Sequence, residues 1–224
     1  MPVSAVGLAV QNIADEKKRL FITQSTGAAD FHGKFCSAYT MQWVFDTHAL
    51  AVGTAQEVVK RGGDTWFFIT DDYAFGQSLE KDAAAMVTRT GGKVLGAVRP
   101  PFAASDVSSF VLQARASKAK IIGIAAGPPN NVNEIKTGGE FGIFKGGQQM
   151  AALLALITDL HSLGLPTAQG PIADDIVLLG YGRQDPPMVE TLFRQDEPDA
   201  DDVAGRRLFG DDALSAGDQG CRHR

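Results

Sequence analysis

The residues best suited to chemistry form one short turn, 71–76, which follows the apolar stretch 66–69 and precedes a predicted helix. The turn supplies two carboxylates, a phenol hydroxyl, aromatic rings and the free N–H groups of a helix start. An open parallel sheet binds ligands just past the carboxyl ends of its strands, so this turn is the expected site. No catalytic set accompanies it, and its groups suit holding a small polar molecule better than transforming one.

Other candidate metal-binding, nucleotide-binding and catalytic motifs in the sequence are incomplete. Residues 46–48 and 159–161 each place an aspartate two residues from a histidine, but neither pair has a third metal ligand. Residues 176–182 look like a strand entering a dinucleotide-binding turn, yet Asp185 occupies the third glycine position and two prolines follow. The sequence has no Gly-x-Ser-x-Gly or phosphate-loop motif. We therefore predict no metal, no cofactor and no enzymatic activity.

Alternating strand and helix patterns must position the turn. Predicted strands cover residues 20–23, 66–69, 93–98, 121–125 and 148–157, and predicted helices begin at Ser4, at Asp46 or Thr47, after Gly76, at Ser105 and at Asn130. The strand at 121–125 is continuously apolar, which is typical of a strand covered on both faces. Three successive strand and helix units imply an α/β fold with a doubly wound parallel sheet and right-handed crossovers.

A second candidate binding segment is the loop at residues 24–30, after the predicted strand 20–23. Its hydroxyls and N–H groups suit a ligand, although a surface turn is an equal alternative. The helix before it carries Val6, Val10 and Ile13 at helical spacing. No strand precedes that helix, so we expect the chain to open in the middle of a fold.

The run at residues 62–85, with residues 43–47 and 105–110, resembles the periplasmic substrate-binding proteins of branched-chain amino acid ABC transporters. These form the leucine-binding protein family, which has the type I periplasmic fold. The resemblance covers residues 2–170 and depends on its length and register rather than on any one motif. It implies two doubly wound α/β lobes that close on a ligand at the hinge.

In that family, residues 1–42 would be the end of the first segment of lobe 1, and residues 43–170 most of lobe 2. The implied function is the solute-binding component of an ABC importer for an amino acid of the branched-chain type or a similar small polar ligand. The closed form would dock on the membrane permease in the periplasm. The alternatives are a ligand-sensing regulatory domain of the same fold and, less favoured because no phosphate-binding turn is intact, a nucleotide-dependent α/β enzyme.

The resemblance also implies ligand-binding residues on both lobes. In the loop of lobe 1, alanines at 28–29 stand where the family has the hydroxyl pair that binds the ligand's carboxylate and amino group, so only Ser25 or Thr26 could take its place.

From lobe 2, Phe75 would close over the ligand with Tyr73 beside it, and Asn130 would face the cleft. Asp159 would pair with the ligand's ammonium group. Each has a simpler alternative: Phe75 as a core residue, for example, and Asp159 as the cap of a helix at residues 160–163.

The net charge of −5 is unevenly distributed. Residues 171–224 contain ten Asp and two Glu against six Arg and no Lys, whereas residues 1–170 carry 15 basic and 14 acidic groups. The resemblance stops at the same place, after Gly170. We hypothesise that residues 171–224 are an out-of-frame, disordered acidic tail, because codons read one base later admit the segments that the family has there.

Composition excludes further classes. The basic residues are scattered over an acidic chain, which argues against nucleic acid. The longest apolar run, 150–157, is far shorter than the roughly 18–20 residues that span a bilayer. No signal peptide opens the chain, which as written would stay in the cytoplasm. Because a partial fold leaves core faces uncovered, we expect weak or absent ligand binding and a tendency to aggregate.

Overall fold

The computed structural model describes residues 3–43, 45–156, 159 and 162–163. Its helices are α1 (Ser4–Glu16), η1 (Ala29–Phe31), α2 (Thr47–Lys60), α3 (Ala74–Arg89), α4 (Ser108–Ala116), α5 (Asn130–Glu140) and η2 (Phe144–Gly146). Its strands are β1 (Phe21–Thr23), β2 (Thr40–Gln42), β3 (Thr65–Thr70), β4 (Lys93–Val98), β5 (Ile121–Ala125) and β6 (Gln149–Ala152). No helix in these ranges is long and apolar enough to cross a membrane.

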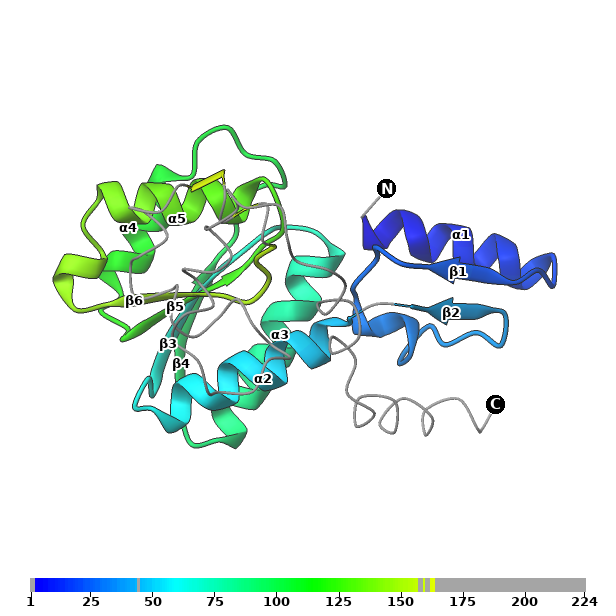
Figure 1. Ribbon diagram of the computed structural model, residues 1–224, viewed down its shortest axis with the longest axis horizontal. Helices are drawn as coiled ribbons and strands as arrows, with labels where there is room; N and C mark the ends of the chain where they lie inside the picture. The colour runs from blue at the N-terminus through cyan, green and yellow to red at the C-terminus, as the bar shows by residue number, and fades with distance from the viewer. Residues whose placement is uncertain (1–2, 44, 157–158, 160–161, 164–224) are drawn as a thin grey trace, which may run out of the picture.

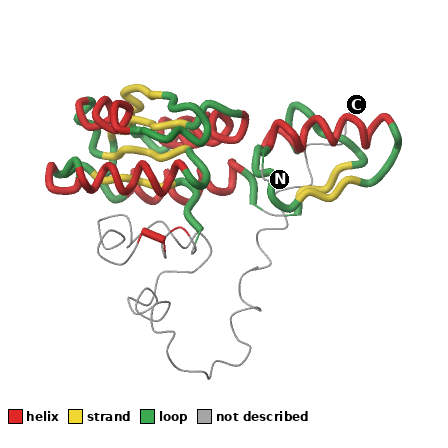
Figure 2. Tube along the Cα trace, turned by 90° about the horizontal axis from the view of Figure 1, so that it is seen from above, coloured by secondary structure: helices red, strands yellow, loops and turns green. Residues whose placement is uncertain are grey.

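The large unit of the structure is a four-stranded sheet between two helical layers. Its strand order is β4-β3-β5-β6, and all neighbours are parallel. Helices α2 and α3 lie along one face, and α4 and α5 along the other (Figures 1 and 2). Every residue of β5 is buried, as its continuous apolar run predicts. The doubly wound parallel sheet expected from the sequence is thereby confirmed.

The small unit consists of α1, β1 and β2, which form a separate end of the molecule (Figure 1). Strands β1 and β2 are parallel neighbours. The start of α2 joins this unit to the large one: Thr47 N donates to Gly27 O at 2.7 Å, and Thr47 Oγ1 accepts from Ala29 N at 3.0 Å. The same hydroxyl donates to Asp82 Oδ2 of α3 at 2.6 Å. The loop after β1 is thus held against the large unit.

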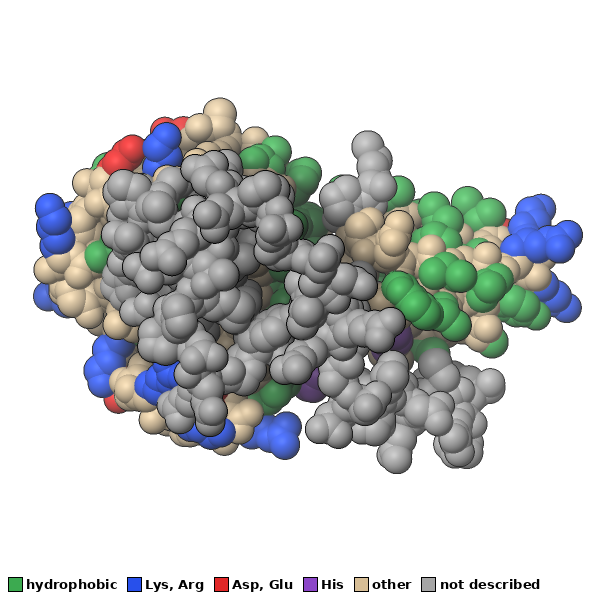
Figure 3. All heavy atoms as spheres, in the orientation of Figure 1, with side chains coloured by type: hydrophobic (Ala, Val, Ile, Leu, Met, Phe, Trp, Pro, Cys, Tyr) green, Lys and Arg blue, Asp and Glu red, His purple; other side chains and the backbone are tan. Residues whose placement is uncertain are grey.

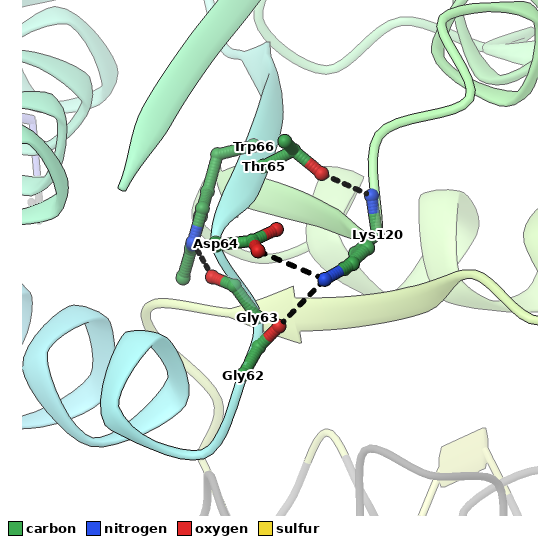
Figure 4. Close-up of polar contacts among 6 residues, drawn as sticks. All are labelled: Gly62, Gly63, Asp64, Thr65, Trp66 and Lys120. Carbon is green, nitrogen blue, oxygen red and sulfur yellow. Dashed lines mark hydrogen bonds and ion pairs between the residues drawn. The ribbon is translucent and has the colours of Figure 1, made fainter. Parts of the chain in front are cut away.

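The amino ends of β3 and β5 are fixed by a polar cluster around Lys120 (Figure 4). Its Nζ contacts Asp64 Oδ2 at 2.9 Å and Gly62 O at 3.2 Å, and its backbone N–H donates to Thr65 Oγ1 at 3.0 Å. The fully buried Trp66 donates its indole N–H to Gly63 O at 2.8 Å. These contacts fix the register between β3 and β5. At the carboxyl ends of the two strands, Thr70 and Ala125 are therefore register partners.

Two predicted helix starts have different outcomes. Asp46 caps α2, since its Oδ1 accepts from Ala49 N at 2.7 Å. The prediction that Ser105 caps a helix is wrong, because α4 begins at Ser108. Asp106 Oδ1 accepts from Ser108 N at 2.8 Å, so the side chain of Asp106 forms a local turn just before α4.

The small unit leaves an apolar face open. Val6, Val10 and Ile13 of α1 are exposed, whereas Ser4, Gly7, Gln11 and Ala14 on the other side of the helix are buried. Ile22 of β1 and Met41 of β2, which are register partners, are exposed as well. Figure 3 shows hydrophobic side chains gathered over this unit. The helix predicted here is correct, but its apolar stripe has no partner among the described residues.

Candidate functional site at the carboxyl ends of β3 and β5

The candidate site lies where the sheet changes its winding direction. The crossover after β3 runs over the face covered by α3, whereas α5, which follows β5, lies on the opposite face. Two neighbouring strands whose following helices diverge leave a crevice at their carboxyl ends, which is where doubly wound sheets bind ligands. The turn after β3 and the loop after β5 meet at this point, as the sequence predicts.

Asp71 ties the two loops together. The side chain is fully buried, and it accepts from Gly127 N at 3.2 Å and from the side-chain amide of Asn130. Asn130 also donates to Pro101 O at 3.0 Å, and Asp72 N donates to Pro100 O at 3.0 Å. The segments that follow β3, β4 and β5 are thus held in one hydrogen-bonded network around a single carboxyl group.

Burial dominates the electrostatics of this network. It raises the pKa of Asp71 from 3.8 to about 6, although the hydrogen bonds from Asn130 and Gly127 act in the opposite direction. Burial, and then the charge of Asp71, raise the pKa of the Tyr73 hydroxyl above its usual range. The phenol therefore stays protonated at neutral pH and is available as a donor.

Replacing Asp71 by asparagine should cost roughly 1–3 kcal/mol at pH 5, because the amide NH₂ would face one of the two N–H donors, whereas a protonated carboxyl keeps an acceptor lone pair on both oxygens. The folded-state pKa of Asp71 lies above the ordinary value, so its contribution to stability is complete below about pH 4 and is lost as the pH rises through about 6. The difference in unfolding free energy between the wild type and Asp71→Asn should therefore become smaller from pH 5 to pH 8. Urea unfolding at both pH values measures it, with the exposed Asp72→Asn as the control; a widening gap would contradict this account.

The sequence-predicted aromatic residues lie at the same edge. Phe75 is almost completely buried and belongs to the core, and its ring centroid lies 6.0 Å from that of the half-buried Tyr73. The loop at residues 24–30 contacts Phe75: a β-carbon at Gly27 would lie 2.7 Å from Phe75 Cε2. Only glycine permits this approach, so the loop of the small unit and Phe75 of the large unit meet.

Of the hydroxyls predicted in that loop, Ser25 is exposed, whereas Thr26 is buried and pairs with the Thr23 hydroxyl. Neighbouring N–H groups are already used, since Ala28 N donates to Ser4 Oγ at 3.3 Å. The structure therefore brings the loop to the site but leaves Ser25 as its accessible hydroxyl. Both residues remain predictions as ligand contacts.

The two remaining predicted residues are buried and hydrogen-bonded. Asn130 contacts Asp71 and Pro101, as described above. Asp159 Oδ2 accepts from Asn131 Nδ2 at 3.1 Å and from Leu156 N at 2.9 Å, which fixes the segment after β6. Both side chains position loops in this structure, and their predicted contacts with a ligand are not tested by it.

Sequence reasoning missed Glu134, one helical turn after Asn130 in α5. The side chain is fully buried, and neither carboxylate oxygen has a hydrogen-bond partner among the described residues. Burial, and then the charge of Asp71, raise its pKa well above the usual range. No pattern in the sequence pointed to it, because a glutamate in a helix is almost always exposed unless it is paired.

Comparison with known proteins identifies the family. The sequence model of the periplasmic binding proteins matches residues 1–175. The chain belongs to this family. A periplasmic binding protein from Burkholderia mallei is similar in structure, with 51% identity and a TM-score of 0.72 over 75% of this chain and 44% of that one. No match is found among the curated proteins.

Two further solved periplasmic binding proteins extend the comparison. A branched-chain amino acid ABC transporter periplasmic ligand-binding protein from Burkholderia xenovorans LB400 is 31% identical, with a TM-score of 0.64 over 75% of this chain and 45% of that one. A solute-binding protein from Rhodopseudomonas palustris in complex with benzoate is 18% identical, with a TM-score of 0.61 over 66% and 40%, and shows the fold alone. The resemblance seen in the sequence is confirmed, and the chain spans less than half the length of these relatives.

The predicted division of the chain into two lobes and a tail is not tested by these findings. The family match ends at residue 175, close to Gly170, where the composition changes. Residues 164–224 lie outside the described residues, so the out-of-frame tail and the lobe boundaries at residues 42 and 170 stay predictions. Among the described residues, no group of three or more His, Cys, Asp or Glu side chains could hold a metal ion.

Proposed function

We propose that this periplasmic binding protein is the solute-binding component of an ABC importer and that it binds an amino acid of the branched-chain type, or a similar small polar ligand, between two lobes. The observation that carries the proposal is the 31% identity to a protein described as a branched-chain amino acid ABC transporter periplasmic ligand-binding protein. A periplasmic location and a membrane permease as partner belong to the same proposal.

The geometry of the candidate site supports this function. Tyr73 and Phe75 lie at the crevice between β3 and β5, and the loop after β1 contacts Phe75 from the small unit. A ligand at this place would touch both units, so it would stabilise the arrangement in which they approach each other. Rigid loops around Asp71 keep the large-unit side of the site preorganised.

Saturation-transfer NMR on the 224-residue chain tests the proposal, because it detects binding down to millimolar affinity, about −4 kcal/mol. We expect signal transfer to at least one ligand from a panel of the natural amino acids and small organic acids. Tyr73→Ala should reduce the transfer, whereas Tyr39→Ala, a half-buried tyrosine of the small unit, should leave it unchanged. No transfer to any ligand of the panel would refute ligand binding by this chain and would match the absent binding that the sequence predicts for a partial fold.

A further inference from the structure

Aromatic rings from separate segments lie close together at the candidate site and give it an aromatic surface. The ring of Tyr73 lies 4.8 Å from that of Phe102, centroid to centroid, at an interplanar angle of 53°. The buried ring of Phe75 lies 6.0 Å from that of Tyr73, centroid to centroid. Phe102 belongs to the loop after β4 and is 44% exposed, so this surface reaches solvent.

A fourth ring joins the surface from the small-unit side. A β-carbon at Gly27 would lie 3.4 Å from Phe45 Cε2 as well as 2.7 Å from Phe75 Cε2, so both rings pack on the same loop residue. Phe45 is 39% exposed. Rings therefore border the site from the segment before α2, from the start of α3 and from the loop after β4.

The polar groups beside these rings are few. Asp71 is fully buried and its carboxylate is already bonded to Gly127 and Asn130. The Tyr73 hydroxyl lies close to Gly127, whose β-carbon would be 3.1 Å away, and it makes no hydrogen bond with the described residues. The large-unit side of the site thus offers a ligand aromatic surface, with the Tyr73 hydroxyl and the exposed Asp72 carboxylate as polar groups.

We propose that the ligand carries an aromatic ring, which packs against Tyr73, Phe102 and Phe45, while its polar group meets the Tyr73 hydroxyl. Rings attract each other in offset and edge-to-face arrangements beyond the area they bury, which an aliphatic side chain cannot reproduce. The exposed carboxylate of Asp72, which accepts from Gln77 Nε2 at 2.9 Å, adds an attraction for a ligand ammonium. This inference depends on the proposed solute-binding function and narrows its ligand class.

The inference is tested by comparing the affinities of phenylalanine, benzoate and leucine for the whole chain, which compete for the site in the saturation-transfer experiment. We expect phenylalanine or benzoate to bind roughly two- to tenfold more tightly than leucine. Tighter binding of phenylalanine than of benzoate identifies an aromatic amino acid, and the reverse order identifies an aromatic acid. Both results support the aromatic ring as the recognised group.

The matched variants are Phe102→Ala and Phe35→Ala, which remove rings of 44% and 41% exposure from the site and from the segment between η1 and β2. Phe102→Ala should weaken the affinity for the aromatic ligand roughly two- to tenfold and leave the affinity for leucine unchanged. Phe35→Ala should change neither affinity. Leucine binding as tightly as both aromatic ligands, or an unchanged affinity in Phe102→Ala, would overturn the inference and leave the solute-binding function intact. Binding of none of the three, with transfer to another ligand of the panel, would overturn the inference alone, whereas no transfer to any ligand of the panel would refute both.

Discussion

Replacing Gly76 by alanine should destabilise the protein by roughly 2–4 kcal/mol, a large effect for the addition of one methyl group. A β-carbon at Gly76 would lie 2.3 Å from the carbonyl oxygen of Asp71 and 2.9 Å from that of Ala125. Both contacts are with backbone, which cannot rotate away. The first turn of α3 must therefore shift, and with it Phe75, which packs against Gly27.

Gly146→Ala is the matched control, since Gly146 is exposed and a β-carbon there would meet no atom within 4 Å. Its stability should stay within about 0.5 kcal/mol of the wild type. Urea unfolding compares the two variants, and saturation transfer to the bound ligand shows whether the site has moved. Equal stability of Gly76→Ala and Gly146→Ala would mean that the turn after β3 does not pack as closely on β5 as described.

The large unit was predictable because its signals are local. Apolar runs gave β3, β4 and β5, and a capping aspartate at residue 46 gave the start of α2. The alternation of these elements leaves few topologies, since parallel strands need crossovers of one hand. The fold class followed from these patterns, before any contact between distant residues was known.

Burial was harder to predict than the elements themselves. The spacing of Val6, Val10 and Ile13 correctly gives a helix, but the side that packs is the small-residue side, where Gly7 lies against Thr26 and Phe31. Periodicity describes one element, whereas burial depends on which surface another element supplies. Strand β6 shows the same limit: it ends at Ala152, although the apolar run continues to residue 157.

The candidate site could be predicted only in part, again because local patterns do not show which segments meet in the fold. The turn that holds Tyr73 and Phe75 could be located, because ligands bind at the carboxyl ends of parallel strands. Phe45 and Phe102 lie in segments without any local signal, and only the folded chain brings them to Tyr73 and Gly27. The burial of Glu134 could not be predicted, because it depends on the packing of α5 against β5 and β6.

Replacing this glutamate by glutamine should stabilise the protein at pH 8, by roughly 1–4 kcal/mol, which is unusual for a core substitution. Glu134 is fully buried without a hydrogen-bond partner among the described residues, and the charge of Asp71 adds to the cost of ionising it. Its pKa is raised above the ordinary 4.5, so its contribution to stability is complete below about pH 4.5 and is lost as the pH rises. Glutamine keeps the shape and removes the charge.

The two proteins should therefore be similar in stability near pH 4.5 and diverge as the pH rises, with roughly 2–4 °C of melting temperature for each kcal/mol. Glu140→Gln, an exposed position on the same helix, should follow the wild type at every pH. A Glu134→Gln variant that is less stable than the wild type at pH 8 would mean that the carboxylate is paired in the folded protein. Since Asn130 and Asp71 lie beside it, the added stability should appear at the loops of the site, where amide hydrogen exchange would slow.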